Sequence, residues 1–566
     1  MSPETNKSEI KIIGDGKPGG KAAGLLRINR LIEEKIDRSL YPKLDIGIPK
    51  FVVLSTSVFD KFMERNVLTE KALVMESDNG IAHLFQKGVL PVEILGELRN
   101  FITEIKNPIA VRSSSMLEDS LEEPFAGVYG TKMVANNSPF ADERYRILTE
   151  AVKFVYSSMY FKSTKQYFRA IKRDIREEKM AIVLQEVAGE KHYNRYYPDI
   201  SGVARSFNYY PSGRSTPQQG VAQLAVGLGK TIVDDGISWN YSPAFPQVSP
   251  PFSGINELLK KTQTKFWAVN TGPVYIYDPV KETEFMIEAE LEDADYDNTL
   301  AYSASTFDVQ SNRVRMGVGY NGIRVINFSQ LLQLDEFGFN GFLRDVLRIC
   351  ETESGCPVEI EFALTHVKES GRMKFDFLQM RPMVVSSEVV NINEADMSSP
   401  DNLLASGKVL GNGFTDEVTD IVYVRKETFD VSKTAIIALE IEEINKRLRD
   451  KGCKALFIGF GRWGSTDKWL GIPVDWGQIS SAKAIAEVML PDFNVELSQG
   501  SHFFHNLISF RVSYFSIDET NGQGIDWGWL ERQKSVEELK FVKHIKTDRP
   551  LKIFVDGRKG RGIIKK

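Results

Sequence analysis

Residues 109–131 read IAVRSSSMLEDSLEEPFAGVYGT, in which a short apolar run passes directly into an arginine, three serines and a polar loop. The apolar run at 108–111 predicts a short strand, which places Arg112 at its mouth. A planar guanidinium in that position can clamp a phosphate through two parallel hydrogen bonds. An arginine at a strand end is more often part of a surface ion pair, so the position of Arg112 alone does not indicate a phosphate site.

Upstream of this stretch, Gly19 and Gly20 precede Lys21, and apolar residues recur at helical spacing from Leu25 to Ile36. The pattern predicts a helix that starts at the two glycines. Lys21 would then combine a point charge with exposed N–H groups and the favourable end of the helix dipole. A Gly-Gly-Lys turn is, however, more often only a helix start.

Downstream, residues 357–364 read PVEIEFAL and residues 374–382 read KFDFLQMRP, and the segment between them, with Gly371 in its turn, predicts a hairpin. Glu359 and Glu361 lie two positions apart, so both project from the same face of a strand, roughly 6.6–6.8 Å apart. Magnesium bound to a triphosphate takes one or two protein carboxylates. By periodicity alone, a strand with its polar face in water is the favoured interpretation. On the second strand, residues of one parity are expected on one face: Phe375, Phe377, Gln379 and Arg381.

The composition is that of an ordinary globular protein. The chain has 566 residues, 42% of them hydrophobic and 26% charged, enough for about three or four domains. A net charge of −5 argues against nucleic acid as a main partner. No apolar stretch approaches the roughly 20 residues of a membrane span, the N-terminus has no signal-peptide pattern, and three cysteines form no CxxC pair. We therefore expect a cytoplasmic, reduced protein without a membrane partner or a structural zinc site.

The chain divides near residues 388–402, where EVV gives way to the turn-rich NINEADMSSPDN. We expect one domain over 1–388 and a second, α/β domain of unknown role over 389–566. Within the first, the pattern predicts helices over about 140–178, a strand at 180–187, and strands from about 200 to 330. The apolar run VYIY at 274–277 is one of those expected strands.

The run GLGKT at 227–231 resembles a phosphate-binding P-loop only superficially. A P-loop needs a further glycine before the Gly-Lys pair, with four residues between them, and Leu224 stands there. The same test at Gly20-Lys21 places Asp15 at that position. A P-loop NTPase is therefore excluded at both places.

Several motifs in order resemble the nucleotide-binding domain of phosphoenolpyruvate synthase and pyruvate phosphate dikinase. They cover roughly residues 10–387: GGKAAGLLR, IPKFVVLSTSVFDKFM, IAVRSSSMLEDSLEEPFAGVYGT, MAIVLQEV, SGVARSF, GLGKTIVDDG, VEIEFAL and LQMRPM. The resemblance implies an α+β protein with a two-lobed ATP-grasp domain that closes over ATP and Mg²⁺. In that family, ATP is split to AMP and orthophosphate, and the β-phosphoryl group passes to a histidine on a swivelling domain.

The resemblance also implies roles for individual residues. Lys21 and Arg112 would contact the phosphates, and the loop at 113–130 would cover them as a lid. Gln185 would lie near the adenine or the hinge. The hairpin residues complete the set: Glu359 and Glu361 would lie near metal and ribose, and Gln379 and Arg381 on the phosphate side.

Two features depart from the family pattern. Relatives commonly read GLGE where this chain has Lys230, so a carboxylate is replaced by a cation beside the expected phosphates. The family's Thr-Ser/Cys-His acceptor motif is absent, and no room remains for the barrel domain of the phosphoenolpyruvate-forming enzymes. His502, followed by His505, is the best acceptor candidate in the chain, although two histidines beside phenylalanines are more often structural. Arg462 and the glycines of the segment GRWGSTDKWLGIPV could bind an anion, while its two tryptophans are equally typical of a core or a domain contact.

Two functions are the leading hypotheses. The first is an ATP-dependent phosphotransferase that modifies a histidine, a partner protein or a small molecule. The second is a non-catalytic sensor or scaffold that binds ATP without turning it over, which Lys230 favours. An interaction module within a larger assembly is a third possibility. The sequence leaves the acceptor, the pathway and the oligomeric state open.

Overall fold

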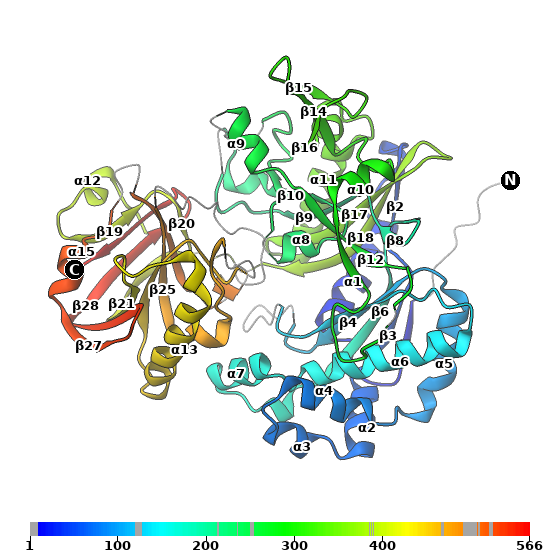
Figure 1. Ribbon diagram of the computed structural model, residues 1–566, viewed down its shortest axis with the longest axis horizontal. Coiled ribbons are helices and arrows are strands. Elements are labelled where there is room, and N and C mark those ends of the chain that lie inside the picture. Colours follow the sequence, from blue (N-terminus) through cyan, green and yellow to red (C-terminus); the bar gives the residue numbers. More distant parts are fainter. Residues whose placement is uncertain are drawn as a thin grey trace.

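The fold is of the α+β class, as expected. A computed structural model describes residues 10–118, 127–211, 214–234, 236–248, 254–274, 276–383, 385, 388, 390–465, 469–490, 506–507, 510–519 and 524–566. Figure 1 shows the N-terminal third in blue and cyan, the middle of the chain in green, and the C-terminal part, from yellow to red, on the opposite side. Three principal sheets organise these parts, and we call them the N-terminal, central and C-terminal sheets.

The N-terminal sheet is packed against helices. In spatial order its strands are β1 (Lys11–Ile13), β3 (Phe51–Leu54), β6 (Met180–Glu186), β4 (Ile109–Ser115) and β5 (Thr131–Val134). Helix α2 packs on β6, and α6 packs on β4, β5 and β6 while α4 and α5 pack on α6. The helices of this part are α2 (Thr56–Asn66), α3 (Thr69–Val74), α4 (Asp78–Gln86), α5 (Val92–Glu104), α6 (Ala141–Ser158) and α7 (Lys162–Ala170). Phe62, Phe85 and Tyr156 are wholly buried between these layers.

The central sheet provides the second layer. Its strands, in spatial order, are β11 (Trp239–Tyr241), β10 (Val221–Val226), β9 (Ile200–Arg205), β17 (Val358–Val367), β18 (Arg372–Pro382) and β2 (Leu44–Gly47). Helix α11 (Phe339–Ser354) packs on β9 and β17, and its apolar stripe buries Phe339, Phe342 and Val346. The hairpin predicted from 357 to 382 is therefore the centre of this sheet.

A bulge in β18 changes which side chains share a face. Glu361 pairs with Gln379, but the next residue of β17, Phe362, pairs with Phe377, so Leu378 is the extra residue. Because paired residues of an antiparallel ladder share a face, the bulge puts Gln379 on the opposite face from Phe377. The expectation that the four odd-numbered residues of β18 share one face was wrong. Phe375 and Phe377 lie in the core, whereas Gln379 and Arg381 lie on the polar face.

Helix α1 (Gly19–Glu34) lies between the two sheets. It packs on β18 of the central sheet and on β4 and β6 of the N-terminal sheet. Gly24 permits the closest approach, since a β-carbon at this position would lie 2.2 Å from the carbonyl oxygen of Met380. The helix thereby carries Lys21, near its N-terminus, to the junction of the two sheets.

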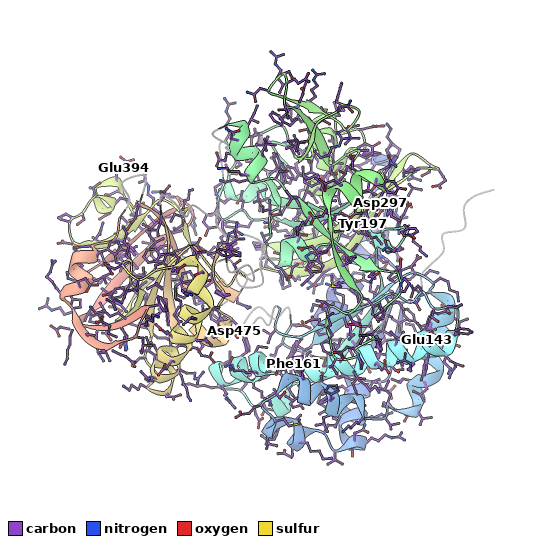
Figure 2. The ribbon with its side chains drawn as sticks, viewed as in Figure 1. Glu143, Phe161, Tyr197, Asp297, Glu394 and Asp475 are labelled. Atoms are coloured by element: carbon purple, nitrogen blue, oxygen red, sulfur yellow. The ribbon has the colours of Figure 1, made fainter. Side chains whose placement is uncertain are left out.

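Two small sheets extend the middle of the chain. One contains β13 (Met286–Glu290), β12 (Lys265–Asn270), β8 (Arg195–Tyr197) and β7 (Glu190–His192), and the other β15 (Arg313–Met316), β14 (Ala304–Asp308) and β16 (Ile323–Ile326). Asp297, just after α10 (Leu291–Tyr296), accepts two hydrogen bonds from Arg195 and one from Tyr197. Figure 2 labels Tyr197 and Asp297 together at this contact, which fixes α10 to β8. The remaining helices here are α8 (Lys230–Val233), α9 (Ile255–Lys260) and the π-helical turn η4 (Gln330–Leu334).

The C-terminal sheet has nine strands within the described residues. They are β19 (Asn402–Ser406), β29 (Arg561–Lys565), β28 (Val542–Asp556), β21 (Asn412–Val424), β22 (Ala455–Phe460), β25 (Ala482–Met489), β26 (Ser513–Asp518) and β20 (Val409–Leu410), with β27 (Lys534–Glu538) paired to β28. Strands β21, β22, β25 and β26 run parallel. The ribbon β23 (Arg462–Trp463) and β24 (Gly471–Ile472) and the helices α12 (Glu394–Met397), α13 (Thr434–Asp450) and α15 (Trp527–Arg532) complete this part.

Helix α7 joins the N-terminal part to the C-terminal part. Glu442 of α13 accepts hydrogen bonds from Gln166 of α7 at 3.1 Å and from Gln478 at 3.0 Å. Gln478 belongs to the short helix η6 (Trp476–Ile479), on which α7 packs. Figure 2 labels Phe161, just before α7, and Asp475, just before η6, at this junction.

Most of the expected elements are present. The strands at 51–54 and 180–187, the helix beginning at Gly19 and the central hairpin are confirmed. The helical region at 140–178 is divided into α6, α7 and the turn η2 (Ile175–Glu177). The strand expected at 274–277 is wrong, since its described residues have no strand pairing. The described part of the chain contains no helix with the length and apolar character of a membrane span, and its three cysteines are free.

Replacing Gly24 by alanine tests the close packing of α1 on β18. The added methyl group meets a backbone carbonyl, so we expect the free energy of unfolding to fall by about 1–3 kcal/mol. Gly96→Ala in α5 is the control, because nothing lies within 4 Å of its new β-carbon and the change should stabilise the helix by about 0.5–1 kcal/mol. Urea unfolding of both variants measures the difference, and an unchanged Gly24→Ala protein would contradict the packing.

Candidate functional site

A cavity of about 500 Å³ lies between the N-terminal and central sheets. Six of the seven residues that the resemblance places near ATP or its metal line it: Lys21, Arg112, Gln185, Glu361, Gln379 and Arg381. They come from α1, β4, β6, β17 and β18, which are far apart in the chain. The topology therefore brings these distant motifs to one place.

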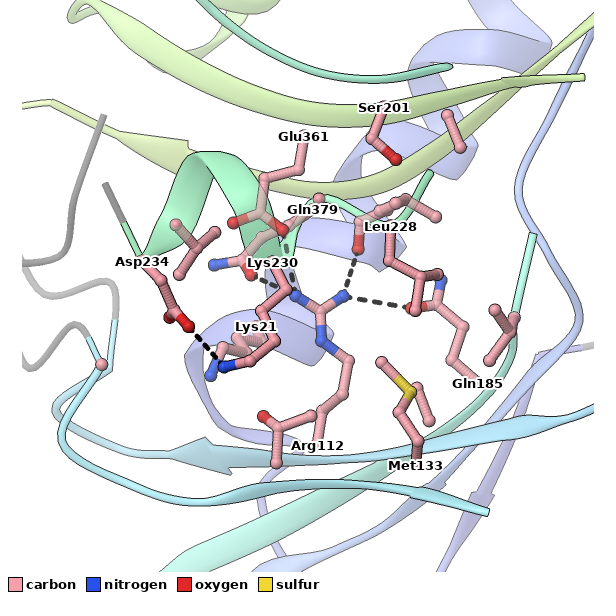
Figure 3. Close-up of a pocket in the computed structure, with 18 of the residues that line it drawn as sticks. Lys21, Arg112, Met133, Gln185, Ser201, Leu228, Lys230, Asp234, Glu361 and Gln379 are labelled. Carbon is pink, nitrogen blue, oxygen red and sulfur yellow. Dashed lines mark hydrogen bonds and ion pairs between the residues drawn. The ribbon is translucent and has the colours of Figure 1, made fainter. Parts of the chain in front are cut away.

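Arg112 connects the two sheets across this cavity (Figure 3). Its Nη1 donates to the Oε1 of Gln185 at 3.1 Å and to the carbonyl oxygen of Leu378 at 2.7 Å. Its Nη2 donates to the Oε2 of Glu361 at 3.1 Å and to the Oε1 of Gln379 at 2.7 Å. The bulge residue Leu378 is thus the one that offers its carbonyl group. Arg112 is held in a fixed orientation by acceptors from β6, β17 and β18.

Lys21 is held at the same junction by the end of β4. Its Nζ lies 2.5 Å from the Oε1 of Glu118 and 3.3 Å from the Oγ of Ser113. The hydroxyl group of Ser114 accepts from the backbone N–H of Ala22. The serines after Arg112 therefore anchor the start of α1 and orient the lysine.

Glu359 does not line the cavity within the described residues; it lies behind Arg381. It stands in a row across the sheet, paired in register with Arg205 on β9 and Arg381 on β18. The Nε of Arg205 donates to one carboxylate oxygen at 2.5 Å, and the Nε of Arg381 donates to the other at 2.7 Å. Because both oxygens are occupied by buried guanidinium groups, the arrangement favours a positioning role for Glu359 over contact with a metal.

Lys230 forms another ion pair at the cavity wall. Its Nζ lies 2.5 Å from the Oδ2 of Asp234, one helical turn later, and both residues line the cavity. The same Nζ lies 5.5 Å from the centre of the Trp267 ring. Lys230, which the sequence singled out, is therefore present at the site and is balanced by a carboxylate.

Sequence reasoning missed several residues of the site. Glu118 and Asp234 have no motif of their own, although each lies near a recognised cation in the chain. Glu282 lines the cavity and accepts from the backbone N–H of Thr131, and burial raises the pKa of its carboxyl group. Lys132 donates to the carbonyl groups that precede Glu282 in the chain, and burial lowers its pKa to about 8. Such contacts depend on tertiary structure, which local patterns do not report.

One end of the cavity is apolar and the other is charged. Ala110, Met133, Val187, Leu228 and Met286 line the apolar end. The buried side-chain amide nitrogen of Gln185 lies near them and has no hydrogen-bond partner among the described residues. A buried donor without a partner is costly unless a ligand satisfies it. The site therefore suits a ligand with a flat apolar group at one end and anionic groups at the other.

Two expectations lie outside the described residues. Residues 119–126 of the lid expected at 113–130 lie outside the described part of the chain, and its first residues, 113–115, belong to β4. His502 and His505, the acceptor candidates, are also outside the described part of the chain. Arg462 is described, in β23, and does not line this cavity.

Residues 17–400 match a protein family whose description is pyruvate phosphate dikinase, AMP/ATP-binding domain. The chain belongs to this family. Membership confirms the resemblance drawn from the motifs, and it identifies an ATP/AMP-binding domain of a phosphotransferase family. A search of curated proteins found no matching relative.

The cavity of this AMP/ATP-binding domain suits a magnesium ion that binds together with a nucleotide. Within the described residues, no three His, Cys, Asp or Glu side chains are grouped so that they could hold a metal ion alone. Magnesium in nucleotide sites takes one or two protein carboxylates and completes its shell with phosphate oxygens and water. Glu361 fits that need, since its Oε1 lies outside the ion pair with Arg112.

Glu178 gives the base of the expected lid a pH-dependent stability. It accepts hydrogen bonds from the backbone N–H groups of Met116 and Leu117, and burial raises its pKa to about 7. The folded protein binds more protons than the unfolded one between about pH 4.5 and 7, so this carboxyl group makes the free energy of unfolding fall as pH rises there.

We expect Glu178→Gln to reduce the difference in unfolding free energy between pH 5 and pH 8 by about 2–3 kcal/mol. Urea unfolding at several pH values measures the profile. Glu177→Gln, at the exposed neighbouring position, is the control and should leave the profile unchanged. Identical profiles for the Glu178→Gln and wild-type proteins would contradict this assignment.

Glu359→Gln separates a positioning role from a metal-binding role. Removing the shared charge between two buried arginines should lower the free energy of unfolding by about 3–5 kcal/mol. Glu336→Gln removes an exposed partner of Lys43 and should change it by about 1 kcal/mol or less. If Glu359→Gln unfolds like the wild type but loses magnesium affinity in calorimetry, Glu359 is a metal ligand instead.

Proposed function

We propose that the chain is an ATP-dependent phosphotransferase. In this proposal, residues 1–388 form a two-lobed ATP-grasp domain, with the N-terminal and central sheets as its lobes, and residues 389–566 form a smaller α/β domain. One observation carries the proposal. Lys21 and Arg112 on one side of the cavity, and Glu361 and Gln379 on the other, converge on a space of about 500 Å³, which falls within the usual range for small-molecule sites of roughly 300–1,000 Å³.

The proposed pose rests on the chemistry of the lining. The base would occupy the apolar end, where the unpaired amide nitrogen of Gln185 can donate to it. The phosphates would lie at the charged end, where Lys21, Arg112 and Arg381 supply cationic donors. Glu361 would hold a magnesium ion there, and the ion, when bound, would supply positive charge against the phosphates.

The proposed reaction yields AMP and orthophosphate. Water takes the γ-phosphoryl group as orthophosphate. An acceptor takes the β-phosphoryl group as the bond between the β-phosphorus and the oxygen bridging to AMP breaks. If the acceptor is a histidine, a ring nitrogen forms the new bond to phosphorus and the ring proton passes to solvent. His502 stays our predicted acceptor in this chain, and a partner protein or small molecule is the alternative.

A second candidate function is a sensor that binds ATP without turning it over. Lys230 favours it, because a further cation beside the phosphates strengthens nucleotide binding whether or not a phosphoryl group leaves. The two functions differ in their products. Incubation with Mg²⁺ and ATP, followed by chromatography and intact-protein mass measurement, distinguishes them. AMP and orthophosphate support the proposal, ADP indicates an ordinary kinase, and binding without products supports the sensor.

Arg112→Ala tests the site itself. The variant loses charged hydrogen bonds to the nucleotide as well as the link between the sheets, so we expect at least a ten-fold loss of ATP affinity and no turnover. Glu361→Ala should also abolish turnover. Isothermal calorimetry measures the affinities, with Arg348→Ala, an exposed substitution on α11, as the control. Full activity in the Arg112→Ala or Glu361→Ala protein would refute the assignment.

A further inference from the structure

Three cations of the cavity are each paired in the structure with a carboxylate that also lines it. Lys21 pairs with Glu118, Arg112 with Glu361, and Lys230 with Asp234. The members of the third pair lie four residues apart, Lys230 on α8 and Asp234 in the turn after it. That third pair has no role in the function proposed above.

Lys230 and Asp234 are placed so that they can separate easily. Their side chains are 29% and 33% exposed, which is far more open than the pair of Lys21 and Glu118. An ion pair this exposed stabilises the fold little, because water screens its charges. Lys230 also has a long, flexible stem, and its contact with the Trp267 ring, which separation would break, is weak at a position this exposed. A strongly anionic ligand in the cavity can therefore replace Asp234 as the ion-pair partner of Lys230 with little loss of free energy.

The charges around the pair determine whether a second ion must enter when it separates. Glu282, on the same wall, interacts electrostatically with both Lys230 and Asp234. If the lysine moves to a phosphate, the carboxylates of Asp234 and Glu282 lose the nearby cation that balances their charge. They then lie beside a polyanion. Such an arrangement is unfavourable unless a cation joins it. A divalent metal ion bound to the phosphates would supply that charge, since carboxylate oxygens are ligands it accepts.

We propose that Lys230 and Asp234 form an exchangeable pair that couples ATP binding to Mg²⁺ binding. Lys230 moves to a phosphate oxygen, and the released Asp234 faces the metal ion that accompanies the nucleotide. This inference rests on the proposed nucleotide site and adds to it a pair of specificity-determining residues. By linkage, Mg²⁺ must raise the affinity for ATP through Asp234 by the same factor by which ATP raises the affinity for Mg²⁺.

Calorimetric titration of ATP, once with EDTA and once with saturating Mg²⁺, tests the coupling in the 566-residue chain. We expect Asp234→Asn to bind metal-free ATP at least about five-fold more tightly than the wild type, and to gain correspondingly less from Mg²⁺. Lys230→Met should bind metal-free ATP at least about five-fold more weakly, whereas Lys230→Arg should keep most of the affinity.

The chain offers a matched control pair on α9. Glu257 and Lys261 are also four residues apart, lie 2.7 Å from each other and are 27% and 28% exposed, but they do not line the cavity. Glu257→Gln and Lys261→Met should leave both titrations unchanged. If these variants shift ATP affinity as much as the cavity variants do, the effect is general electrostatics and the proposal is overturned.

The outcomes separate this inference from the proposed function. If the wild type binds ATP and Arg112→Ala does not, but Asp234→Asn keeps the wild-type gain from Mg²⁺ within two-fold, the exchange is wrong and the nucleotide site stands. If the wild type binds no ATP with or without Mg²⁺, both proposals are refuted. The exchange is supported if Mg²⁺ raises the ATP affinity of Asp234→Asn less than that of the wild type, while the Glu257→Gln and Lys261→Met variants behave like the wild type.

Discussion

The guanidinium group of Arg112 is the contact on which the site depends. It reaches from β4 to acceptors on β6, β17 and β18, so it sets the distance between the N-terminal and central sheets. Arg112 and Glu361 are only 14% and 17% exposed, and a charge with so little water needs several acceptors at once. The bulge at Leu378 supplies one of them. Cavity shape and cation orientation are thereby determined together.

The electrostatics of the cavity suit a ligand that carries its own counter-ion. Lys21, Arg112 and Lys230 each lie beside a carboxylate, so the cavity lacks the concentrated positive charge that would attract any anion. Arg381 is also paired with a carboxylate, but its partner, Glu359, lies outside the cavity lining. An anion that binds without a metal ion must break these ion pairs, and it leaves the carboxylates without a counter-charge. An anion that arrives with a metal ion satisfies both members of each pair.

The motifs predicted the family, the α+β class and six residues that meet in one cavity, because each motif carries its ligand-facing side chain close to a glycine, serine or strand end. Periodicity could not predict the bulge at Leu378, since one extra residue leaves the apolar pattern intact while reversing the face of Gln379. The position of Glu359 behind the wall depends on Arg205, about 150 residues away in the chain. The apolar run at 274–277 suggested a strand, but a strand also needs a neighbour to pair with.

Helix α7 has a consequence for the C-terminal part of the molecule. Phe161 and Ser163, at its start, line the cavity, while Gln166, one turn further on, is hydrogen-bonded to Glu442 of α13. A rigid helix of nine residues cannot shift at one end without shifting at the other. Movement of the C-terminal part is therefore coupled to the wall of the nucleotide cavity. A partner that bound α13 and displaced it would also displace the cavity residues at the start of α7.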